Sequence, residues 1–333
     1  MKTGLTLGKY APFHKGHQYV IETALAEMDH VIVLIYNSPE VTTIPLTVRA
    51  DWIRKLYPRV EVIEAWNGPA KTGNSPEIHK MHEDYIINTI GIRNIDAFYT
   101  SEFYGHHMSE ALGAENRLVD TERKNFNISA TKIREAPYAN REFLDPAVYT
   151  DLIANIVFLG APCTGKTTIA RHLAEKFKTE WMHEHGRDYW EANQKNRRLT
   201  PEQLVTIAKE HLVLENQQLK NANRFLFTDT NAITTSVFAR YYHKNIHPDL
   251  HDLTTIAEKR YDLVFLCGTD IPYDTTWDRS GDINRTLFQK MITADLQQRK
   301  LPFFLLEGDL QSRIDQVSII INRFEKYQNI LTL

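Results

Sequence analysis

Short apolar runs alternate with segments of helical periodicity along the whole chain. In the first half, the apolar runs predict strands at Thr3–Gly8, Val31–Tyr36, Val60–Ala65, Ala97–Thr100 and Arg117–Asp120. Apolar residues that recur every three to four positions predict helices at Gly16–Met28, Leu46–Leu56, Pro76–Ile90 and Ala130–Ala136. Strands that alternate with helices in this way are typical of an α/β fold with largely parallel sheets.

The alternation continues in the second half, after a change in composition. Apolar runs predict strands at Asn155–Leu159, Phe225–Thr228, Leu263–Cys267 and Phe303–Glu307. The longest helical pattern runs from Pro201 to about Asn221, with a capping box expected between Thr200 and Gln203. Prolines and polar residues precede the first apolar run of the second half. We therefore place the boundary between the two domains between Pro146 and Ala154. The hypothesis is two domains, residues 1–150 and 151–333.

Composition narrows the class of protein further. With 333 residues, of which 42% are hydrophobic and 24% charged, each half can bury its own core. The net charge of −3 argues against a nucleic-acid partner, because dedicated nucleic-acid binders carry a strongly basic domain. Two cysteines supply no disulfide framework and indicate a reducing compartment. No run has the 18 apolar residues of a membrane span, and the start lacks a signal-peptide core. We therefore expect a cytoplasmic protein without membrane insertion; a homo-oligomer is left open.

A phosphate-binding loop is expected after the first strand of the second domain. Between Leu159 and the helix that opens at Lys166, the chain matches the pattern GxxxxGK[ST] without a gap. Glycines let backbone N–H groups turn toward a β-phosphate, Lys166 reaches the β- and γ-oxygens, and Thr167 can hold Mg²⁺. The predicted ATP-binding residues here are Gly160, Ala161, Pro162, Cys163, Thr164, Gly165, Lys166, Thr167 and Thr168.

A carboxylate for the metal is expected at the end of a buried strand. The apolar run Phe225–Asp229 ends in an acid, which is the arrangement that holds Mg²⁺ directly or through water. The alternative is that Asp229 caps the next helix, expected at Asn231–Arg240. Both roles are compatible, since the carboxyl ends of parallel strands are where such sites lie.

A polar segment late in the chain carries arginines that could reach a transferred phosphate. Asp278, Arg279 and Arg285 precede a helix expected at Thr286–Leu296. Arginines held over a phosphate neutralise the charge that develops in the transition state. Arg279 is the candidate ATP-binding residue, and a solvated surface arginine is the alternative.

The sequence HEHGRD at residues 183–188 has two interpretations. Its histidines and acids would allow a metal site, although neither HExxH spacing nor a cysteine supports one. After the second strand of a P-loop kinase, Glu184, Arg187 and Asp188 would instead face the acceptor substrate. There a carboxylate binds ribose hydroxyls or accepts the proton of the attacking one. We favour the acceptor site.

The first domain has its own candidate chemistry at the end of its first strand. The sequence GKYAPFHKGH, which begins at Gly8, places His14 and His17 on either side of Gly16. Much later, ISATKIR places Ser129, Thr131, Lys132 and Arg134 at a helix start. Together these groups describe a site for attack on the α-phosphate of ATP, in which the imidazoles donate to the oxygens of pentavalent phosphorus.

At this point the chain resembles a known family. GKYAPFHKGH with NISATKIR resembles the nucleotidyltransferase superfamily, specifically nicotinamide mononucleotide adenylyltransferases of the NadR type. GAPCTGKT, EHGRD and FTDTN resemble, in the expected order, the ribosylnicotinamide kinase half of the same bifunctional proteins. The resemblance implies a Rossmann-like nucleotidyltransferase domain followed by a P-loop kinase domain. It covers about residues 3–325.

The resemblance implies two reactions that use ATP with Mg²⁺. The kinase would phosphorylate nicotinamide riboside to nicotinamide mononucleotide, and the transferase would join that product to AMP, giving NAD and pyrophosphate. In the transferase it assigns His14 and His17 to catalysis and the following residues to ATP: Gly8, Lys9, Gly16, Ser129, Thr131 and Arg134. In the kinase it assigns Lys166, Glu184 and Asp229 to catalysis, Thr167 and Asp229 to the metal, and Arg187 to the riboside. Tyr242 and Trp66 are the candidates for stacking on the nicotinamide ring of the two substrates.

Larger members of this family carry an N-terminal helix-turn-helix domain. Because the first strand is expected to begin at Thr3, we expect the form that lacks this domain and has no repressor role. Two alternatives to the function stay open. One is a phosphopantetheine adenylyltransferase joined to a dephospho-coenzyme A kinase, and the other is a nucleotide sensor with one inactive site.

Overall fold

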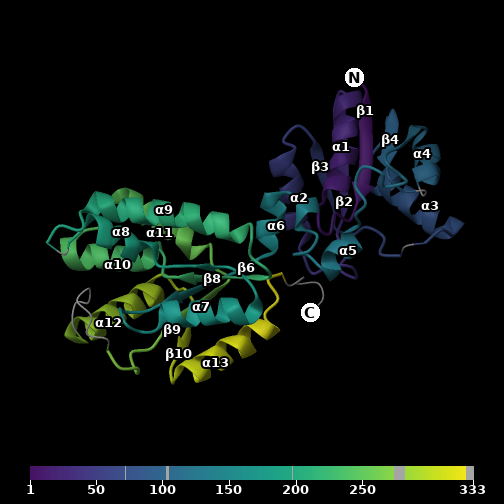
Figure 1. The fold of residues 1–333 in the computed structure, drawn as a ribbon. Coiled ribbons are helices and arrows are strands. Elements are labelled where there is room, and N and C mark those ends of the chain that lie inside the picture. The colour runs from purple at the N-terminus through teal and green to yellow at the C-terminus, as the bar shows by residue number, and fades with distance from the viewer. Residues whose placement is uncertain (72, 103–104, 197, 274–281, 328–333) are drawn as a thin grey trace. The chain divides into compact units, whose positions relative to one another are not determined.

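The computed structural model describes residues 1–71, 73–102, 105–196, 198–273 and 282–327. Contacts between Cα atoms divide the chain into two compact units, one built on Met1–Tyr149 and the other on Thr150–Lys326. Each unit contains a five-stranded sheet whose strands are all parallel (Figure 1). Within the described residues, no helix combines the length and apolar character needed to cross a membrane.

The sheet of the first unit has the strand order β3-β2-β1-β4-β5. Its strands are β1 (Thr3–Gly8), β2 (His30–Tyr36), β3 (Glu61–Ala65), β4 (Ala97–Thr100) and β5 (Glu115–Leu118). Its α-helices are α1 (Lys15–Glu27), α2 (Leu46–Leu56), α3 (Pro76–Asp84), α4 (Gly105–Leu112) and α5 (Ala130–Glu135). Helix α6 (Pro146–Leu152) contains the boundary between the two units. Six of the seven residues of β2 are buried, as expected for an inner parallel strand that is covered on both faces.

The sheet of the second unit has the order β10-β9-β6-β8-β7. Its strands are β6 (Ala154–Leu159), β7 (Trp181–Met182), β8 (Phe225–Asp229), β9 (Leu263–Cys267) and β10 (Phe304–Leu306). Its α-helices are α7 (Lys166–Phe177), α8 (His185–Asn193), α9 (Pro201–Leu219), α10 (Ala232–His243), α11 (Pro248–Glu258), α12 (Asp282–Gln298) and α13 (Leu310–Arg323).

Alternation along the strands of the second unit builds two cores. Val157 and Leu159 of β6 pack in the core that also contains residues of α9, α10 and α12. Ile156 and Phe158, the intervening residues, pack with α7 and α13 on the other face. Figure 1 shows α9 and α13 on opposite sides of the sheet. The first strand is thus buried on both faces, and the loop that follows it is fixed at its carboxyl end.

Most of the strands and helices that were predicted match the structure within one or two residues, and the largest error among the predicted strands is at β5. That strand is Glu115–Leu118, whereas Arg117–Asp120 was expected. Asp120 lies beyond it with φ 51°, and its carboxylate accepts hydrogen bonds from the backbone N–H groups of Lys124, Asn125 and Phe126. The strand therefore stops before a turn that this carboxylate organises. Strand β7 and helices α4, α6, α8, α11 and α13 were not expected. The helix expected at Thr286–Leu296 is the longer α12, and the helix expected at Pro76–Ile90 changes to a π-helix at Tyr85.

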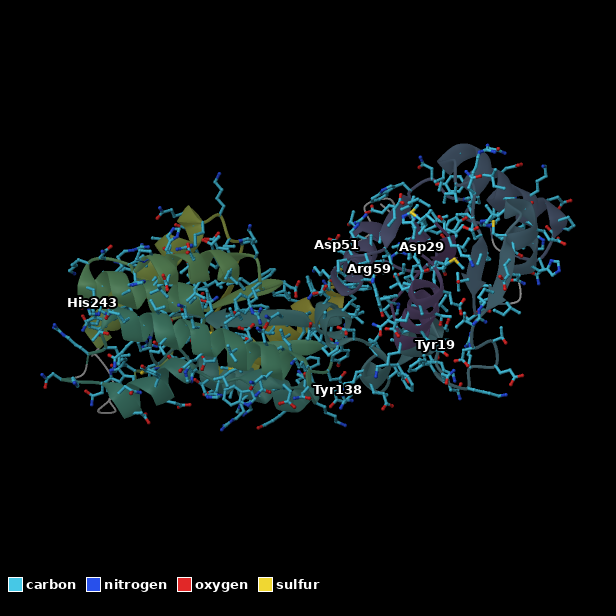
Figure 2. All side chains as sticks on the ribbon, turned by 90° about the horizontal axis from the view of Figure 1, so that it is seen from above. Tyr19, Asp29, Asp51, Arg59, Tyr138 and His243 are labelled. Carbon is cyan, nitrogen blue, oxygen red and sulfur yellow. The ribbon has the colours of Figure 1, made fainter. Side chains whose placement is uncertain are left out.

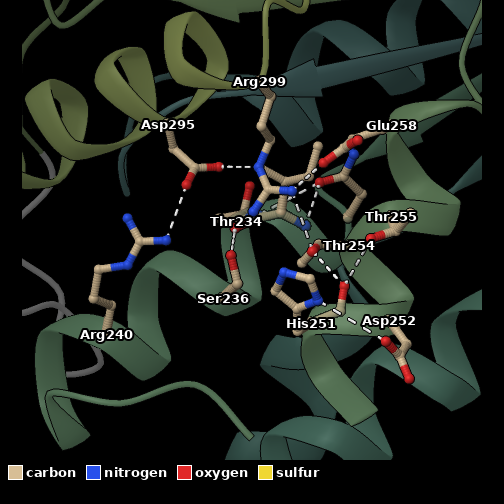
Figure 3. A network of polar contacts seen from close by, with 12 residues as sticks. Thr234, Ser236, Arg240, His251, Asp252, Thr254, Thr255, Glu258, Asp295 and Arg299 are labelled. Carbon is tan, nitrogen blue, oxygen red and sulfur yellow. Dashed lines mark hydrogen bonds and ion pairs between the residues drawn. The ribbon is translucent and has the colours of Figure 1, made fainter. Parts of the chain in front are cut away.

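A network of charged side chains around the buried Asp295 joins α10, α11 and α12 (Figure 3). Asp295 of α12 is 3% exposed and accepts hydrogen bonds from Arg240 of α10 at 3.1 Å and from Arg299 Nε at 2.6 Å. Arg299 also pairs with Glu258 of α11 and donates to Thr254 Oγ1. The network holds α12 against the two helices beside it.

We expect Asp295→Ala to lower the free energy of unfolding by about 2 kcal/mol, because Arg240 and Arg299 both lose hydrogen bonds to a buried carboxylate. Asp252→Ala is the control, since Asp252 lies on neighbouring α11 with its side chain 85% exposed. It should change the free energy of unfolding by less than about 0.5 kcal/mol. Urea denaturation of both variants measures the difference. Equal values for the two variants would show that the network does not stabilise this unit.

Candidate active sites

The predicted phosphate loop lies between β6 and α7. Gly165 has φ 83° and precedes α7, and Gly160 has φ 143°. A Cβ atom at Gly160 would lie 2.8 Å from the carbonyl oxygen of Cys267, so only glycine fits there. Lys166 is 7% exposed, and its ammonium group donates to the carbonyl of Ala161 at 3.1 Å. The loop therefore forms the expected cradle at the start of a helix.

Side chains from distant segments hold this loop in place. Gln289 of α12 accepts a hydrogen bond from the N–H of Ala161 at 2.9 Å. Arg285, also of α12, donates to the carbonyl of Cys163 at 3.0 Å. Arg313 of α13 is 3% exposed and donates to the carbonyl of Thr164 at 2.7 Å. Sequence analysis noted Arg285 only as a phosphate ligand and missed the other two, which no local motif marks.

Thr167 and Asp229 meet beside the loop. The hydroxyl of Thr167 donates to one carboxylate oxygen of Asp229, which is 0% exposed. The other oxygen, Oδ1, is buried without a hydrogen-bond partner among the described residues. Burial raises the pKa of Asp229, and the nearby charge of Glu184 raises it further. A hydroxyl beside a buried carboxylate fits a hard divalent cation. Asp229 does not cap α10, because Asn231 does so.

A cavity of about 420 Å³ lies beside the phosphate loop in the second unit. Pro162 of the loop lines it, together with the predicted acceptor residues Glu184, Arg187 and Tyr242. Aromatic side chains gather at α8 and the later part of α10, and further lining residues are Trp190, Leu204, Ile207, His211, Thr230, Asn231, Phe238 and His243. A volume of this size suits a small ligand.

Three residues that lie beside Glu184 and Arg187 in the sequence, His183, His185 and Asp188, do not line this cavity. His183 pairs with Asp188 at 2.9 Å, and His185 with Glu210 at 2.8 Å. Asp188 does not line the cavity, although the sequence placed it at the acceptor. No group of three metal-ligating side chains occurs among the described residues, which gives the metal interpretation of HEHGRD no support. Thr168 is exposed on α7, and Arg279 lies outside the described residues.

In the first unit, the two predicted histidines lie together at the start of α1. Their rings stack with centroids 3.6 Å apart, and the N–H of His14 donates to Nδ1 of His17 at 3.3 Å. A Cβ atom at Gly16 would lie 3.1 Å from the ring of His14. Since Nδ1 of His17 accepts a hydrogen bond, the neutral ring carries its proton on Nε2 and can donate from there.

Both imidazoles are neutral at physiological pH. Burial lowers the pKa of His14 to about 4, with a smaller contribution from the charge of Arg123. Burial also lowers the pKa of His17 well below its usual value, and His14 and Arg123 add to the effect. Nδ1 of His14 is buried and has no hydrogen-bond partner among the described residues. Neutral rings can interact with a ligand through hydrogen bonds but do not present two positive charges.

The residues predicted around the histidines lie on three segments. Ser129 caps α5 by accepting from the N–H of Lys132 at 3.3 Å. Arg134 donates to Thr131 Oγ1 at 3.0 Å and to the carbonyl of Ala11 at 2.6 Å, which ties α5 to the loop after β1. Gly8 ends β1, and the ammonium group of the following Lys9 pairs with Glu40 at 3.3 Å. The structure thus joins the two predicted motifs through Arg134.

Two arginines of this site were missed by the sequence analysis. Arg49 of α2 is 0% exposed and donates to the carbonyls of Lys9, Tyr36, Asn37 and Ile44. It fixes the loop after β1 to the end of β2. Arg123 follows β5, and its charge acts on both histidines. Trp66 follows β3 and is 47% exposed, so its predicted stacking role stays a prediction.

The stability of the protein should fall as the pH drops from about 6.5 toward 4. The unfolded state binds a proton at His14 first, because folding lowers this pKa to about 4. Each pH unit in this window then costs about 1.4 kcal/mol for that histidine. In His14→Asn, the free energy of unfolding, measured with urea, should fall less steeply. His106→Asn is the control, since that side chain is 72% exposed. Parallel pH profiles for wild type and His14→Asn would contradict this assignment.

The fold and the two loop-to-helix sites define a nucleotidyltransferase unit joined to a P-loop unit. Residues 5–136 match the cytidylyltransferase-like family, and residues 155–313 match a family described as an AAA domain. The combination supports nucleotidyltransferase and kinase activities in one chain.

Relatives of nearly full length refine this assignment. The chain is 29% identical to the trifunctional NAD biosynthesis/regulator protein NadR of Salmonella typhimurium over 93% of its length and 80% of the relative. It is 29% identical to NadR of Escherichia coli over 92% of its length and 79% of the relative. A solved structure of NadR in complex with NAD and AMP-PNP has the same fold, with TM-score 0.58, 22% identity and 97% of both chains covered. The chain is thus a homologue of the NadR proteins over nearly its whole length.

The phosphopantetheine alternative has weaker support. A phosphopantetheine adenylyltransferase of Phocaeicola vulgatus is 30% identical over 139 residues. That match covers 87% of the relative but 40% of this chain. It extends over one nucleotidyltransferase unit, whereas the NadR match includes both units in their order.

Proposed function

We propose that the second unit phosphorylates nicotinamide riboside with ATP and that the first adenylylates the resulting mononucleotide to NAD, releasing pyrophosphate. The observation that carries the proposal is the cavity beside the phosphate loop. It combines a carboxylate, Glu184, with Arg187 and the aromatic ring of Tyr242. A riboside with a flat cationic ring has groups that suit all three. Solved NadR structures that contain NAD or NR support the same assignment for this family.

In the kinase unit, different residues of the phosphate loop would contact different phosphates of ATP. The backbone of Gly160–Gly165 would surround the β-phosphate, and Lys166 would reach the β- and γ-oxygens. Glu184 lies near enough to Asp229 for its charge to raise the pKa of that carboxyl. From there it would accept the proton of the 5′-hydroxyl as that oxygen bonds to the γ-phosphorus and ADP leaves.

Thr167 and Asp229 would hold the metal, and we assign Mg²⁺ to them. The unpartnered oxygen of Asp229 and the adjacent hydroxyl offer hard oxygen ligands without a nitrogen or sulfur donor. Bound there, Mg²⁺ would supply positive charge against the β- and γ-phosphates. Removal of divalent ions with a chelator should therefore abolish phosphorylation, and added Mg²⁺ should restore it.

In the transferase unit, the neutral histidines would donate to the α-phosphate of ATP. The mononucleotide phosphate attacks the α-phosphorus, and pyrophosphate leaves, so no covalent enzyme intermediate is needed. Nε2–H of His17 is the available donor, because its Nδ1 is occupied by the N–H of His14. Ser129, Thr131 and Arg134 would hold the outer phosphates, and Gly8 and Lys9 would lie under the nucleotide. Trp66 would cover the nicotinamide ring.

A product assay with two acceptors tests this proposal. The purified chain is incubated with ATP, Mg²⁺ and either nicotinamide riboside or phosphopantetheine, and the products are separated by chromatography. We expect NAD from the first mixture and no dephospho-coenzyme A from the second. Formation of dephospho-coenzyme A alone would overturn the assignment in favour of the phosphopantetheine alternative. Absence of any product would indicate a sensor.

A further inference from the structure

The cavity of the second unit has an aromatic end and a polar end. At the aromatic end, α10 finishes at His243, labelled in Figure 2, whose ring nitrogen lies 2.9 Å from the carbonyl oxygen of Leu199 before α9. At the polar end, His211 of α9 and Ala232 at the start of α10 together line a second, smaller cavity. Because α10 starts next to β8, the polar end lies at the carboxyl edge of the sheet, near Asp229.

His211 is a polar group that the proposed mechanism does not use. It is 6% exposed, and Nε2 has no hydrogen-bond partner among the described residues. The same nitrogen lies 3.6 Å from the carboxylate of Glu215, one helical turn further along α9. Glu215 is 0% exposed and accepts from Asn155 Nδ2 at 2.5 Å, from Arg260 Nε at 2.7 Å and from Tyr261 OH at 2.8 Å. Its carboxylate is therefore fixed in place.

The negative charge of Glu215, 3.6 Å from Nε2, favours one of the two positions for the proton of His211. A neutral imidazole has one N–H donor and one acceptor, and a neighbouring carboxylate favours the proton on the nitrogen that faces it. For His211 this nitrogen is Nε2, so Nδ1 is an acceptor. Burial lowers the pKa of His211 to about 4, which keeps the ring neutral. His211 lines the cavity beside the phosphate loop. With Nε2 on the side of Glu215, the ring nitrogen that remains to accept a hydrogen bond from a ligand is Nδ1.

We propose that His211, oriented by Glu215, is a specificity-determining residue that accepts a hydrogen bond from a ribose hydroxyl of the bound nucleoside. The inference rests on the proposed kinase function. The reacting 5′-hydroxyl must lie next to the phosphate loop, which meets the cavity at Pro162. The nicotinamide ring then extends toward Phe238 and Tyr242 at the aromatic end. The ribose occupies the polar end, beside His211. The site thereby selects a ribonucleoside over a deoxyribonucleoside.

The test compares nicotinamide riboside with its 2′-deoxy and 3′-deoxy analogues as kinase substrates. We expect wild type to prefer the riboside by at least about tenfold in kcat/KM over the analogue that lacks the contacted hydroxyl. His211→Leu should lose about tenfold in kcat/KM for the riboside and little for that analogue. The preference should therefore fall toward one. His211→Asn, whose amide oxygen can replace the Nδ1 acceptor, should keep part of it.

His251→Leu is the matched control, because it changes a histidine with a 67% exposed side chain on α11. It should keep the wild-type preference. The inference is wrong if His211→Leu keeps the wild-type preference for the riboside over both deoxy analogues. It is also wrong if His211→Leu and His211→Asn each slow the reaction of all three substrates by the same factor. If wild type phosphorylates none of the three, the proposed kinase function itself fails. The two failures are thus distinguished by the wild-type rate.

Discussion

Lys166→Met is expected to lower kcat for riboside phosphorylation by about 10²–10³-fold and to leave NAD formation from nicotinamide mononucleotide unchanged. The ammonium group is buried at the start of α7 and directed into the phosphate loop, where it donates to the carbonyl of Ala161. Methionine keeps the volume of the stem but removes the charge that, on our proposal, would stabilise the γ-phosphate during transfer. Rates of mononucleotide formation and of NAD formation, measured separately, report on the two units.

The control for this variant is Lys220→Met, since Lys220 is exposed at the end of α9. Its rates should match those of wild type in both assays. A Lys166→Met protein that still phosphorylates the riboside at the wild-type rate would show that this loop does not bind the transferred phosphate.

His17→Ala is expected to impair the transferase reaction and not the kinase reaction, the reverse of Lys166→Met. It should lower kcat for NAD formation from nicotinamide mononucleotide by about 10²–10³-fold and spare the kinase reaction. The reason is the fixed tautomer: the N–H of His14 donates to Nδ1 of His17, so Nε2–H remains to donate to the α-phosphate. His17→Gln, whose amide can donate, should retain more activity than His17→Ala.

His106→Ala controls for the loss of an imidazole from the same unit, because its side chain is 72% exposed on α4. If the transferase rate of His17→Ala equals that of His106→Ala, the histidine pair takes no part in the chemistry.

Local motifs allowed much of both sites to be predicted. The phosphate loop depends on glycine conformations and on a lysine one position later, and all of these are adjacent in sequence. The end of β8 was predictable for the same reason, because an apolar run leads directly into Asp229. The capping box between Thr200 and Gln203 is also local, and the structure confirms it.

The groups that support these motifs could not be predicted, because they come from distant segments. Gln289 and Arg313 lie more than a hundred residues after the loop that they hold, and they belong to helices with ordinary amphipathic patterns. Arg49 is another example, since a buried arginine that binds four backbone carbonyls looks like a surface residue in the sequence. His211 was not singled out because only the packing of α9 against α10 reveals the cavity that it lines.

The central claim is that two separate loop-to-helix sites transfer different parts of ATP in one chain. It is tested most directly by supplying nicotinamide riboside, Mg²⁺ and ATP that carries ³³P at the α-position and ³²P at the γ-position. The account predicts NAD that contains both labels in equal amounts, one from each unit. NAD with the α-label alone, or labelled mononucleotide that never becomes NAD, would contradict it.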